Sequence, residues 1–316
     1  MRIVFMGTPQ LAAMMMEELA SRLDVVLAVT RPDAVSGRGA ALRPSAVRAT
    51  AERLGIPVAL ASKIDNDVIE RIKCEQPDAI CVAAFGCLLP DDLLELPRLG
   101  CLNVHMSLLP RWRGAAPLER AILAGDEKIG FSVMRMEHGL DTGPYCMQVG
   151  ISAESLYLND FERRFAKEGA DALCVSIEGL DSGSMEWEEQ DSDCATYAAK
   201  IGKDELAISP ELPAAQIYAH VRASSDAHPA RCIIAERKVT VERLRPVVPE
   251  TLPVQDFHFE EGFAYYIGKR LYLSCSDGLL EVEALKPSGK NSMDGKAFAA
   301  GIQNFKKEPK PWGGIL

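Results

Sequence analysis

The first half of the chain alternates short apolar runs with stretches of helical period, and this alternation limits the fold more than any other feature. Apolar runs predict strands at 2–6, 24–29, 57–60 and 78–83. Apolar residues recurring every three or four positions predict helices at 11–22, 45–54 and 65–75, with Ser45 as the cap of the second helix. Strands alternating with helices indicate βαβ units, so we predict the α/β class with a mainly parallel, doubly wound, Rossmann-like sheet.

The same alternation continues to about residue 178. Further strands are predicted at 100–105, 128–136 and 144–150, and further helices at 117–124 and 155–178. In a doubly wound sheet, ligands bind beyond the carboxyl ends of the strands, where the strand order reverses. We therefore expect residues at the end of the strand 100–105 to face a site.

The pattern changes after residue 207. Following a predicted helix at 212–223, brief runs rich in β-branched and aromatic residues predict strands at 231–235, 238–244, 263–267, 270–274 and 279–285. Their spacing fits an OB-like barrel or a sandwich, and periodicity does not choose between them; we expect the small OB-like β-barrel. Because 181–195 is polar and acidic, we predict domains over 1–181 and 208–316, joined by a link over 182–207.

Composition fits a globular protein. Of the 316 residues 47% are hydrophobic, which is enough for a sizeable core. No run of eighteen apolar residues occurs, and the chain opens as a strand rather than as a signal peptide, so we expect a cytoplasmic protein without membrane contact. The nine cysteines lack CxxC spacing and no HExxH motif occurs, so no metal is expected.

The net charge of −10 argues against a nucleic-acid partner, because phosphate binding depends on Lys and Arg. The distribution of charge along the chain weakens this argument. Residues 208–316 hold 14 Lys and Arg against 13 Asp and Glu, a balance of +1, which leaves −11 for the first 207 residues. Such asymmetry indicates two domains with different surfaces.

Asn103, His105 and Asp141 form a candidate catalytic set. Asn103 and His105 are two positions apart on one predicted strand, so their side chains share a face near its end. Transfer of an acyl group to an amine needs a donor for the developing oxyanion, a group that handles the proton, and a group that orients the imidazole. The three side chains match these roles, although His105 also fits a hydrogen-bonded strand-end histidine and Asp141 a plain turn residue.

Four segments carry a resemblance to a known family. They are Asn-Val-His-Met-Ser-Leu-Leu-Pro-Arg-Trp-Arg-Gly-Ala-Ala-Pro at 103–117, Gly-Leu-Asp-Thr-Gly at 139–143, Ile-Val-Phe-Met-Gly-Thr-Pro at 3–9 and Leu-Lys-Pro-Ser-Gly-Lys at 285–290. With them the sequence resembles the folate-dependent formyltransferases over nearly its whole length.

The resemblance implies 10-formyltetrahydrofolate as formyl donor, used as a co-substrate. It also implies that the formyl group is accepted by the amino group of methionine on initiator methionyl-tRNA, a reaction that serves translation initiation. Asn103, His105 and Asp141 match the family's catalytic residues. The residues that match its folate site are Ser107, Leu108, Leu109 and Pro110. We expect a monomer.

The resemblance also assigns a tRNA-binding loop. Gly37, Arg38, Gly39 and Arg43 match a family loop that receives the tRNA acceptor end, and 31–53 holds five Arg against one Asp and one Glu. A Gly-rich turn with Arg also fits a flexible solvated loop. In the barrel, tRNA contact is expected from some of Lys269, Arg270, Lys286, Lys290, Lys306, Lys307 and Lys310.

Three departures from the family pattern stand out. Met106 replaces a usual Gly or Ala, and is expected to narrow the pocket. The loop after Arg38 lacks the lysines that often follow, which weakens its attraction for phosphate. Ser-Asp-Ala-His-Pro at 225–229 stands where an Asn-Pro-Trp-Pro-like run is more frequent, so the entry into the barrel is expected to differ.

Two other functions remain open at this level. One is formyl transfer to an amino sugar nucleotide, by the same three catalytic residues. The other is an inactive RNA-binding protein that keeps the fold. The Gly37–Gly39 loop favours tRNA over the sugar, and the intact catalytic set argues against the inactive protein.

Overall fold

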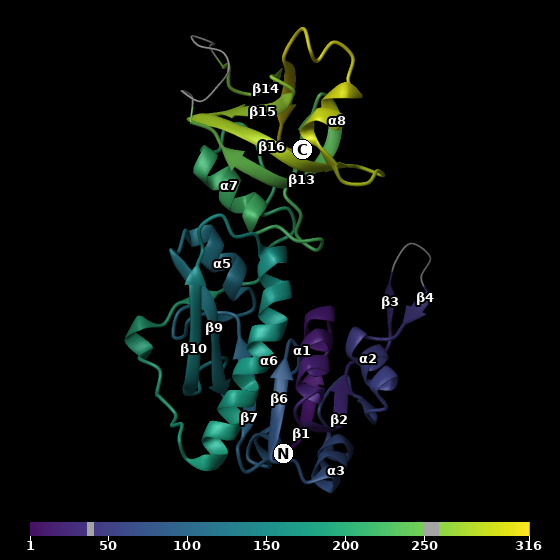
Figure 1. Ribbon diagram of the computed structural model, residues 1–316, viewed down its shortest axis with the longest axis vertical. Coiled ribbons are helices and arrows are strands. Elements are labelled where there is room, and N and C mark those ends of the chain that lie inside the picture. The colour runs from purple at the N-terminus through teal and green to yellow at the C-terminus, as the bar shows by residue number, and fades with distance from the viewer. Residues whose placement is uncertain (37–40, 249–258, 316) are drawn as a thin grey trace. The chain divides into compact units, whose positions relative to one another are not determined.

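The computed structural model describes residues 1–36, 41–248 and 259–315, which divide into two units (Figure 1). The first unit comprises Met1–Pro117, Lys128–Ser152 and Asp160–Ala199. The second comprises Leu118–Glu127, Ala153–Asn159 and Lys200–Leu316. Residues of the predicted link thus lie in the first unit as far as Ala199. The predicted domain boundaries at 181 and 208 stay a prediction.

A seven-stranded sheet forms the centre of the first unit. Its strands are β1 (Arg2–Gly7), β2 (Asp24–Thr30), β5 (Val58–Leu60), β6 (Ala79–Ala83), β7 (Cys101–His105), β9 (Lys128–Arg135) and β10 (Tyr145–Ser152). Their order is β10-β9-β7-β6-β1-β2-β5, parallel from β7 to β5 and antiparallel at β9 and β10. The predicted mainly parallel, doubly wound sheet is confirmed.

Helices cover both faces of this sheet. They are α1 (Gln10–Ala20), α2 (Ala46–Leu54), α3 (Asn66–Glu75), α4 (Asp91–Leu94) and α6 (Leu158–Ser182). Val4 and Met6 of β1 share one buried cluster with Ile69 and Ile72 of α3. On the opposite face, a Cβ at Gly169 of α6 would lie 3.2 Å from Met15 of α1. Burial on both faces explains why β1 reads as an uninterrupted apolar run.

Local signals set the helix ends. The Ser45 hydroxyl accepts a hydrogen bond from the backbone N–H of Arg48, which confirms the predicted cap, and Asp65 accepts from Val68 at the start of α3. Gly55 ends α2 in the left-handed conformation. Two short strands that periodicity did not predict, β3 (Ala34–Ser36) and β4 (Ala41–Arg43), pair antiparallel with each other.

The second unit contains a closed barrel. Its strands are β12 (Arg231–Ile234), β13 (Arg237–Pro246), β14 (Phe263–Ile267), β15 (Arg270–Cys275), β16 (Gly278–Pro287) and β18 (Lys310–Gly313). Their order is β13-β12-β18-β14-β15-β16, and β13 also pairs with β16, which closes a ring of six strands. This closure excludes the sandwich and confirms the predicted barrel. A short strand, β17 (Met293–Asp294), adds to β16.

Alternate residues of the barrel strands point into one core. Leu271 and Leu273 of β15 are fully buried, as are Val241 of β13 and Leu280 of β16. The remaining elements are β8 (Arg113–Gly114), β11 (Tyr197–Ala198), α5 (Pro117–Ala124), α7 (Ala214–Arg222), α8 (Gly295–Ala300) and the 3-10 helix η1 (Ser192–Cys194). Within the described ranges, no helix combines the length and the apolar character needed to cross a bilayer.

Candidate active site

The carboxyl end of β7 places Asn103 and His105 where the sheet changes direction. β7 is parallel to β6 on one side and antiparallel to β9 on the other. Both side chains line a cavity of about 760 Å³, which Asp141 also lines. The structure therefore brings the three predicted catalytic residues together at the edge of the sheet where β6 and β7 end, next to the point between β1 and β6 where the strand order reverses.

His105 is 5% exposed, and both ring nitrogens face defined groups. Nε2 lies 2.8 Å from the carbonyl oxygen of Trp112, and Nδ1 lies 3.7 Å from Oδ2 of Asp141. Because a carbonyl only accepts, Nε2 must carry hydrogen, and a neutral imidazole then presents a bare Nδ1 to the carboxylate side. A second proton, when present, is carried on Nδ1 beside Asp141.

The Asp141 carboxylate is held by the backbone. Oδ2 accepts a hydrogen bond from the N–H of Gly114 at 2.9 Å, and Asp141 itself adopts a left-handed conformation with φ of 53°. Gly114 has φ of 121°, and a Cβ there would lie 2.8 Å from the carbonyl oxygen of Ala198. Only glycine fits this position without a shift of the neighbouring backbone.

Two loops form the walls of the cavity, and the sequence indicated only the one that carries Asp141. One is 84–90, which follows β6, and the other is 136–141. Leu88 is 84% exposed and Leu140 is 60% exposed, so each wall carries an exposed apolar side chain. Loop 84–90 follows the carboxyl end of the predicted strand 78–83, and the rule for switch points could have identified it.

Met106 also lines the cavity and is partly exposed. Its neighbours Ser107, Leu108, Leu109 and Pro110 are not among the described residues that line it. The Ser107 hydroxyl donates to the carbonyl oxygen of Arg111 at 2.7 Å, and Ser107 and Leu109 are buried. Their predicted contact with folate stays a prediction.

Two side chains fasten this Ser107–Pro110 segment to β9 and β10. The Ser132 hydroxyl donates to the carbonyl oxygen of Ser107 at 2.7 Å and accepts from the N–H of Leu109 at 3.0 Å. Gln148 Nε2 donates to the carbonyl oxygen of Leu109 at 2.7 Å and to the Ser132 hydroxyl at 3.0 Å. The segment that follows β7 is thus held by hydrogen bonds to Ser132, a fully buried residue.

The predicted tRNA-binding residues lie elsewhere. Gly37, Arg38 and Gly39 fall outside the described residues. Arg43 is exposed at the end of β4 and does not line the cavity. Their role in tRNA binding stays a prediction.

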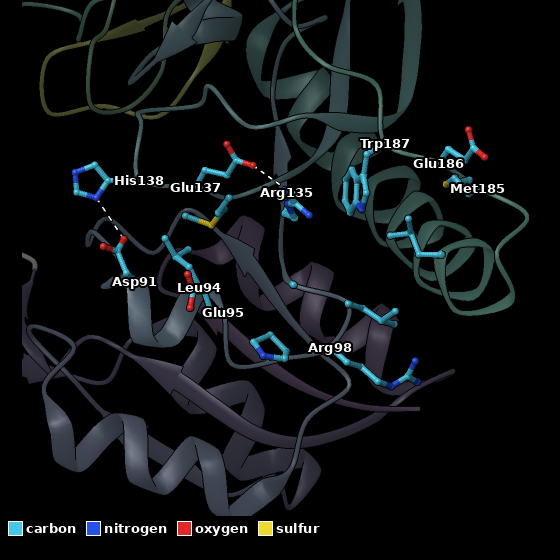
Figure 2. Close-up of a pocket in the computed structure, with 15 residues that line it drawn as sticks. Asp91, Leu94, Glu95, Arg98, Arg135, Glu137, His138, Met185, Glu186 and Trp187 are labelled. Atoms are coloured by element: carbon cyan, nitrogen blue, oxygen red, sulfur yellow. Dashed lines mark hydrogen bonds and ion pairs between the residues drawn. The ribbon is translucent and has the colours of Figure 1, made fainter.

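Figure 2 shows a second cavity, of about 840 Å³. Its lining shares Asp91, Glu137 and His138, among others, with that of the first cavity. Arg135 pairs with Glu137 at 3.0 Å, and its guanidinium lies 5.7 Å from the centre of the Trp187 ring. His138 pairs with Asp91 at 3.3 Å, and Arg98 with Asp181 at 2.5 Å. Both arginines of this cavity, Arg98 and Arg135, are therefore paired with carboxylates, and this pairing makes the cavity unfavourable for an anionic ligand.

Across the described ranges, no group of three His, Cys, Asp or Glu side chains is placed to hold a metal ion. The first cavity combines apolar walls with the amide of Asn103, the imidazole of His105 and the carboxylate of Asp141. Such a mixture suits an uncharged ring system held by a few polar contacts.

Two protein-family models match the chain. The Formyl transferase model matches residues 1–177, and the model for the Formyl transferase C-terminal domain matches residues 200–303. The methionyl-tRNA formyltransferase of Pseudomonas entomophila (strain L48) is 38% identical over 323 residues, which cover 100% of this chain and 99% of that protein.

Solved structures with low sequence identity share the fold. The methionyl-tRNA formyltransferase from Clostridium thermocellum has a TM-score of 0.54 and 17% identity, over 83% of this chain and 100% of that one. HypX from Aquifex aeolicus in complex with tetrahydrofolic acid has a TM-score of 0.64 and 14% identity, over 97% of this chain and 48% of HypX. The family match over more than half of the chain and the relative that matches its full length show that this chain belongs to the formyl transferase family, together with the methionyl-tRNA formyltransferases.

Proposed function

We propose that this protein transfers the formyl group of 10-formyltetrahydrofolate to the amino group of methionine on initiator methionyl-tRNA, giving N-formylmethionyl-tRNA for translation initiation. The observation that carries the proposal is the convergence of Asn103, His105 and Asp141 on one cavity of a formyl transferase fold. The relative that matches the full length is a methionyl-tRNA formyltransferase, which favours this acceptor.

The reaction makes one bond and breaks one. The amine nitrogen of methionine bonds to the formyl carbon, and the bond from that carbon to N10 of the folate breaks. The amine loses a proton and N10 gains one, so the exchange balances without an oxidant or a metal. The protein must therefore stabilise an oxyanion and move a proton.

Each catalytic side chain has a role in this scheme. The Asn103 amide donates a hydrogen bond to the oxyanion. Because Nε2 of His105 is committed to the Trp112 carbonyl, the N–H that reaches the oxyanion is the one on Nδ1. Asp141, 3.7 Å from Nδ1, stabilises the charged imidazole and passes a proton through water, since the gap is too long for a direct hydrogen bond.

The co-substrate fits the cavity by size and chemistry. A volume of about 760 Å³ with apolar walls suits a flat heterocycle, and HypX, which shares the fold, has been crystallised with tetrahydrofolic acid. We place the folate ring between the walls 84–90 and 136–141, beside Met106. Ser107, Leu108, Leu109 and Pro110 match the family's folate site, and their contact with the folate is part of this proposal.

The acceptor is held by the predicted tRNA contacts. Arg38 and Arg43, with Gly37 and Gly39, receive the acceptor end, and the barrel supplies further cations. Phosphate contacts of this kind fix orientation rather than sequence. The finer expectation of a cytoplasmic monomer also belongs to this proposal, and light scattering on the purified protein tests the monomer.

One assay tests the proposal. Purified protein is mixed with 10-formyltetrahydrofolate and initiator tRNA charged with methionine, and formylmethionine is measured with and without an amino sugar nucleotide as competing acceptor. We expect formylmethionyl-tRNA and no formylated sugar. Formylation of the sugar alone would reassign the acceptor, and tight tRNA binding without any formyl transfer would identify an inactive RNA-binding protein.

A further inference from the structure

Residues 185–199, which we call the strap, follow α6 and pack along the first unit (Figure 1). At one end, Glu188 and Tyr145 exchange both backbone hydrogen bonds, at 2.8 and 3.0 Å. The Tyr145 hydroxyl also donates to Glu188 at 2.6 Å, and this bond raises the pKa of Tyr145 to about 12. The strap is therefore fastened to β10 before it reaches the active site.

Farther along, the strap contacts residues 112–114, which hydrogen-bond to the side chains of His105 and Asp141. The Thr196 hydroxyl accepts from the N–H of Trp112 at 2.9 Å, and the Thr196 carbonyl accepts from the N–H of Arg113 at 2.9 Å. Trp112 offers its carbonyl to His105, and Gly114 offers its N–H to Asp141. Strap residues thus hold the peptide that orients the imidazole and the carboxylate.

Gln190 joins this segment to the turn that carries Asp141. Its Nε2 donates to the carbonyl oxygens of Asp141 at 2.9 Å and Gly143 at 2.7 Å. Its Oε1 accepts from Nε of Arg113, a side chain only 3% exposed, at 2.9 Å. The amide uses both hydrogens and its oxygen, so no shorter or apolar side chain can replace these contacts.

We propose that Gln190 is a positioning residue for formyl transfer, which holds the Asp141 carboxylate in register with Nδ1 of His105. The inference rests on the proposed function and adds a residue outside the cavity. Gln190 does not line the cavity, so it acts through the Asp141 turn and through Arg113. A shift of the carboxylate by a fraction of an ångström changes the proton path without changing the surfaces that bind substrates.

The test compares Gln190→Ala with Gln190→Glu. For Gln190→Ala we expect kcat to fall by about 10- to 100-fold, as for misplaced catalytic groups, while KM for tRNA and folate stays within about twofold. Gln190→Glu keeps an acceptor for Arg113 but sets a carboxylate against two carbonyl oxygens. It is therefore expected to remain slow, and recovery of kcat in Gln190→Glu would overturn the role of the amide donors.

Two controls separate positioning from docking of the strap. Tyr145→Phe removes a side-chain bond of the strap but no contact to Asp141, and Glu189→Gln changes an exposed neighbour. Both are expected to keep kcat within about twofold, as surface changes do. A fall in kcat for Tyr145→Phe equal to that for Gln190→Ala would overturn the proposal, because strap docking alone would then account for it.

A crystal structure of Gln190→Ala gives a readout besides rate. We expect the Asp141 carboxylate to move away from the N–H of Gly114, and an unmoved carboxylate would contradict the inference. Wild-type protein that fails to formylate methionyl-tRNA would contradict the proposed function, whereas an active wild type with an equally active Gln190→Ala would contradict this inference alone.

Discussion

Gly114 donates its backbone N–H to the Asp141 carboxylate, with 2.9 Å between the nitrogen and Oδ2. The same oxygen faces Nδ1 of His105, so a main-chain group fixes where the negative charge stands relative to the imidazole. Main-chain donors are rigid, and rigid donors are what a catalytic carboxylate needs to keep one orientation. The position of Gly114 is therefore a condition for the proposed chemistry.

Gly114→Ala is expected to lower kcat by about 100-fold or more, as for a misplaced catalytic group. The added Cβ would lie 2.8 Å from the carbonyl oxygen of Ala198. The alanine would also have to adopt a φ of 121°, which L side chains rarely do. Steady-state kinetics with thermal unfolding measure both effects. Gly55→Ala is the matched control, because Gly55 also has positive φ but has open space around it. The control should lose stability only, and full activity in Gly114→Ala would contradict the role of this contact.

His105→Ala is expected to lower kcat by about 10²- to 10⁴-fold, the usual contribution of a positioned acid or base. Circular dichroism should show an unchanged fold. His228→Ala serves as control, since that histidine lies in the second unit and does not line the cavity. Near-normal turnover by His105→Ala would reduce His105 to the hydrogen-bonded strand-end histidine that the sequence alone also allows.

Ser132→Ala is expected to lower the free energy of unfolding by about 1–3 kcal/mol, because its loss leaves buried partners unsatisfied. The Ser132 hydroxyl is fully buried and contacts Ser107, Leu109 and Gln148. Denaturant unfolding measures the loss. If the Ser107–Pro110 segment shapes the folate site, Ser132→Ala raises KM for folate but not KM for tRNA. Equal changes in both KM values would argue against that role.

Glu119→Gln is expected to raise the melting temperature at pH 7. Burial raises the pKa of Glu119, with His228 and Arg120 opposing the shift more weakly. A raised pKa favours the protonated form in the folded protein, so stability is lost as the pH rises through the folded pKa. The gain from Gln should thus vanish toward pH 4. Glu261→Gln, an exposed change, should show no such trend, and a constant difference at all pH values would refute the explanation.

Arg38→Ala is expected to raise KM for tRNA by about tenfold with little change in kcat, since a phosphate contact adds binding without touching the reacting atoms. The effect should shrink as salt is raised. Arg71→Ala, on the exposed side of α3, controls for the loss of one positive charge. An unchanged KM at low salt would identify the Gly37–Gly39 loop as a solvated turn.

The sequence predicted the elements whose side chains repeat with a regular period. β6 was expected at 78–83 and spans Ala79–Ala83, and α5 was expected and found at 117–124. The convergence of Asn103 and His105 also followed, because alternation along a strand places both on one face. Asp141 joined the set for its chemistry, as a carboxylate that can orient the imidazole, and the family resemblance supported that choice; periodicity did not place it beside His105.

What the sequence did not predict depends on contacts between distant residues. Residues 181–195 have a polar composition typical of a link, yet Gln190 in this stretch contacts Asp141, 49 residues earlier. The pattern of apolar residues does not predict hydrogen bonds between the Gln190 amide and backbone carbonyl groups that lie distant in the sequence. The wall 84–90 was missed for a related reason, since an irregular loop carries no period.

The strap also determines when a newly made chain can have a complete site. Asp141 receives a hydrogen bond from Gln190, 49 residues later, and Trp112 bonds to Thr196, 84 residues later. Because synthesis runs from the amino terminus, His105 and Asp141 leave the ribosome well before the residues that hold them in place. A growing chain therefore carries the proposed catalytic side chains before it has the contacts that orient them, and the proposed role of Gln190 requires the strap to be translated before formyl transfer begins.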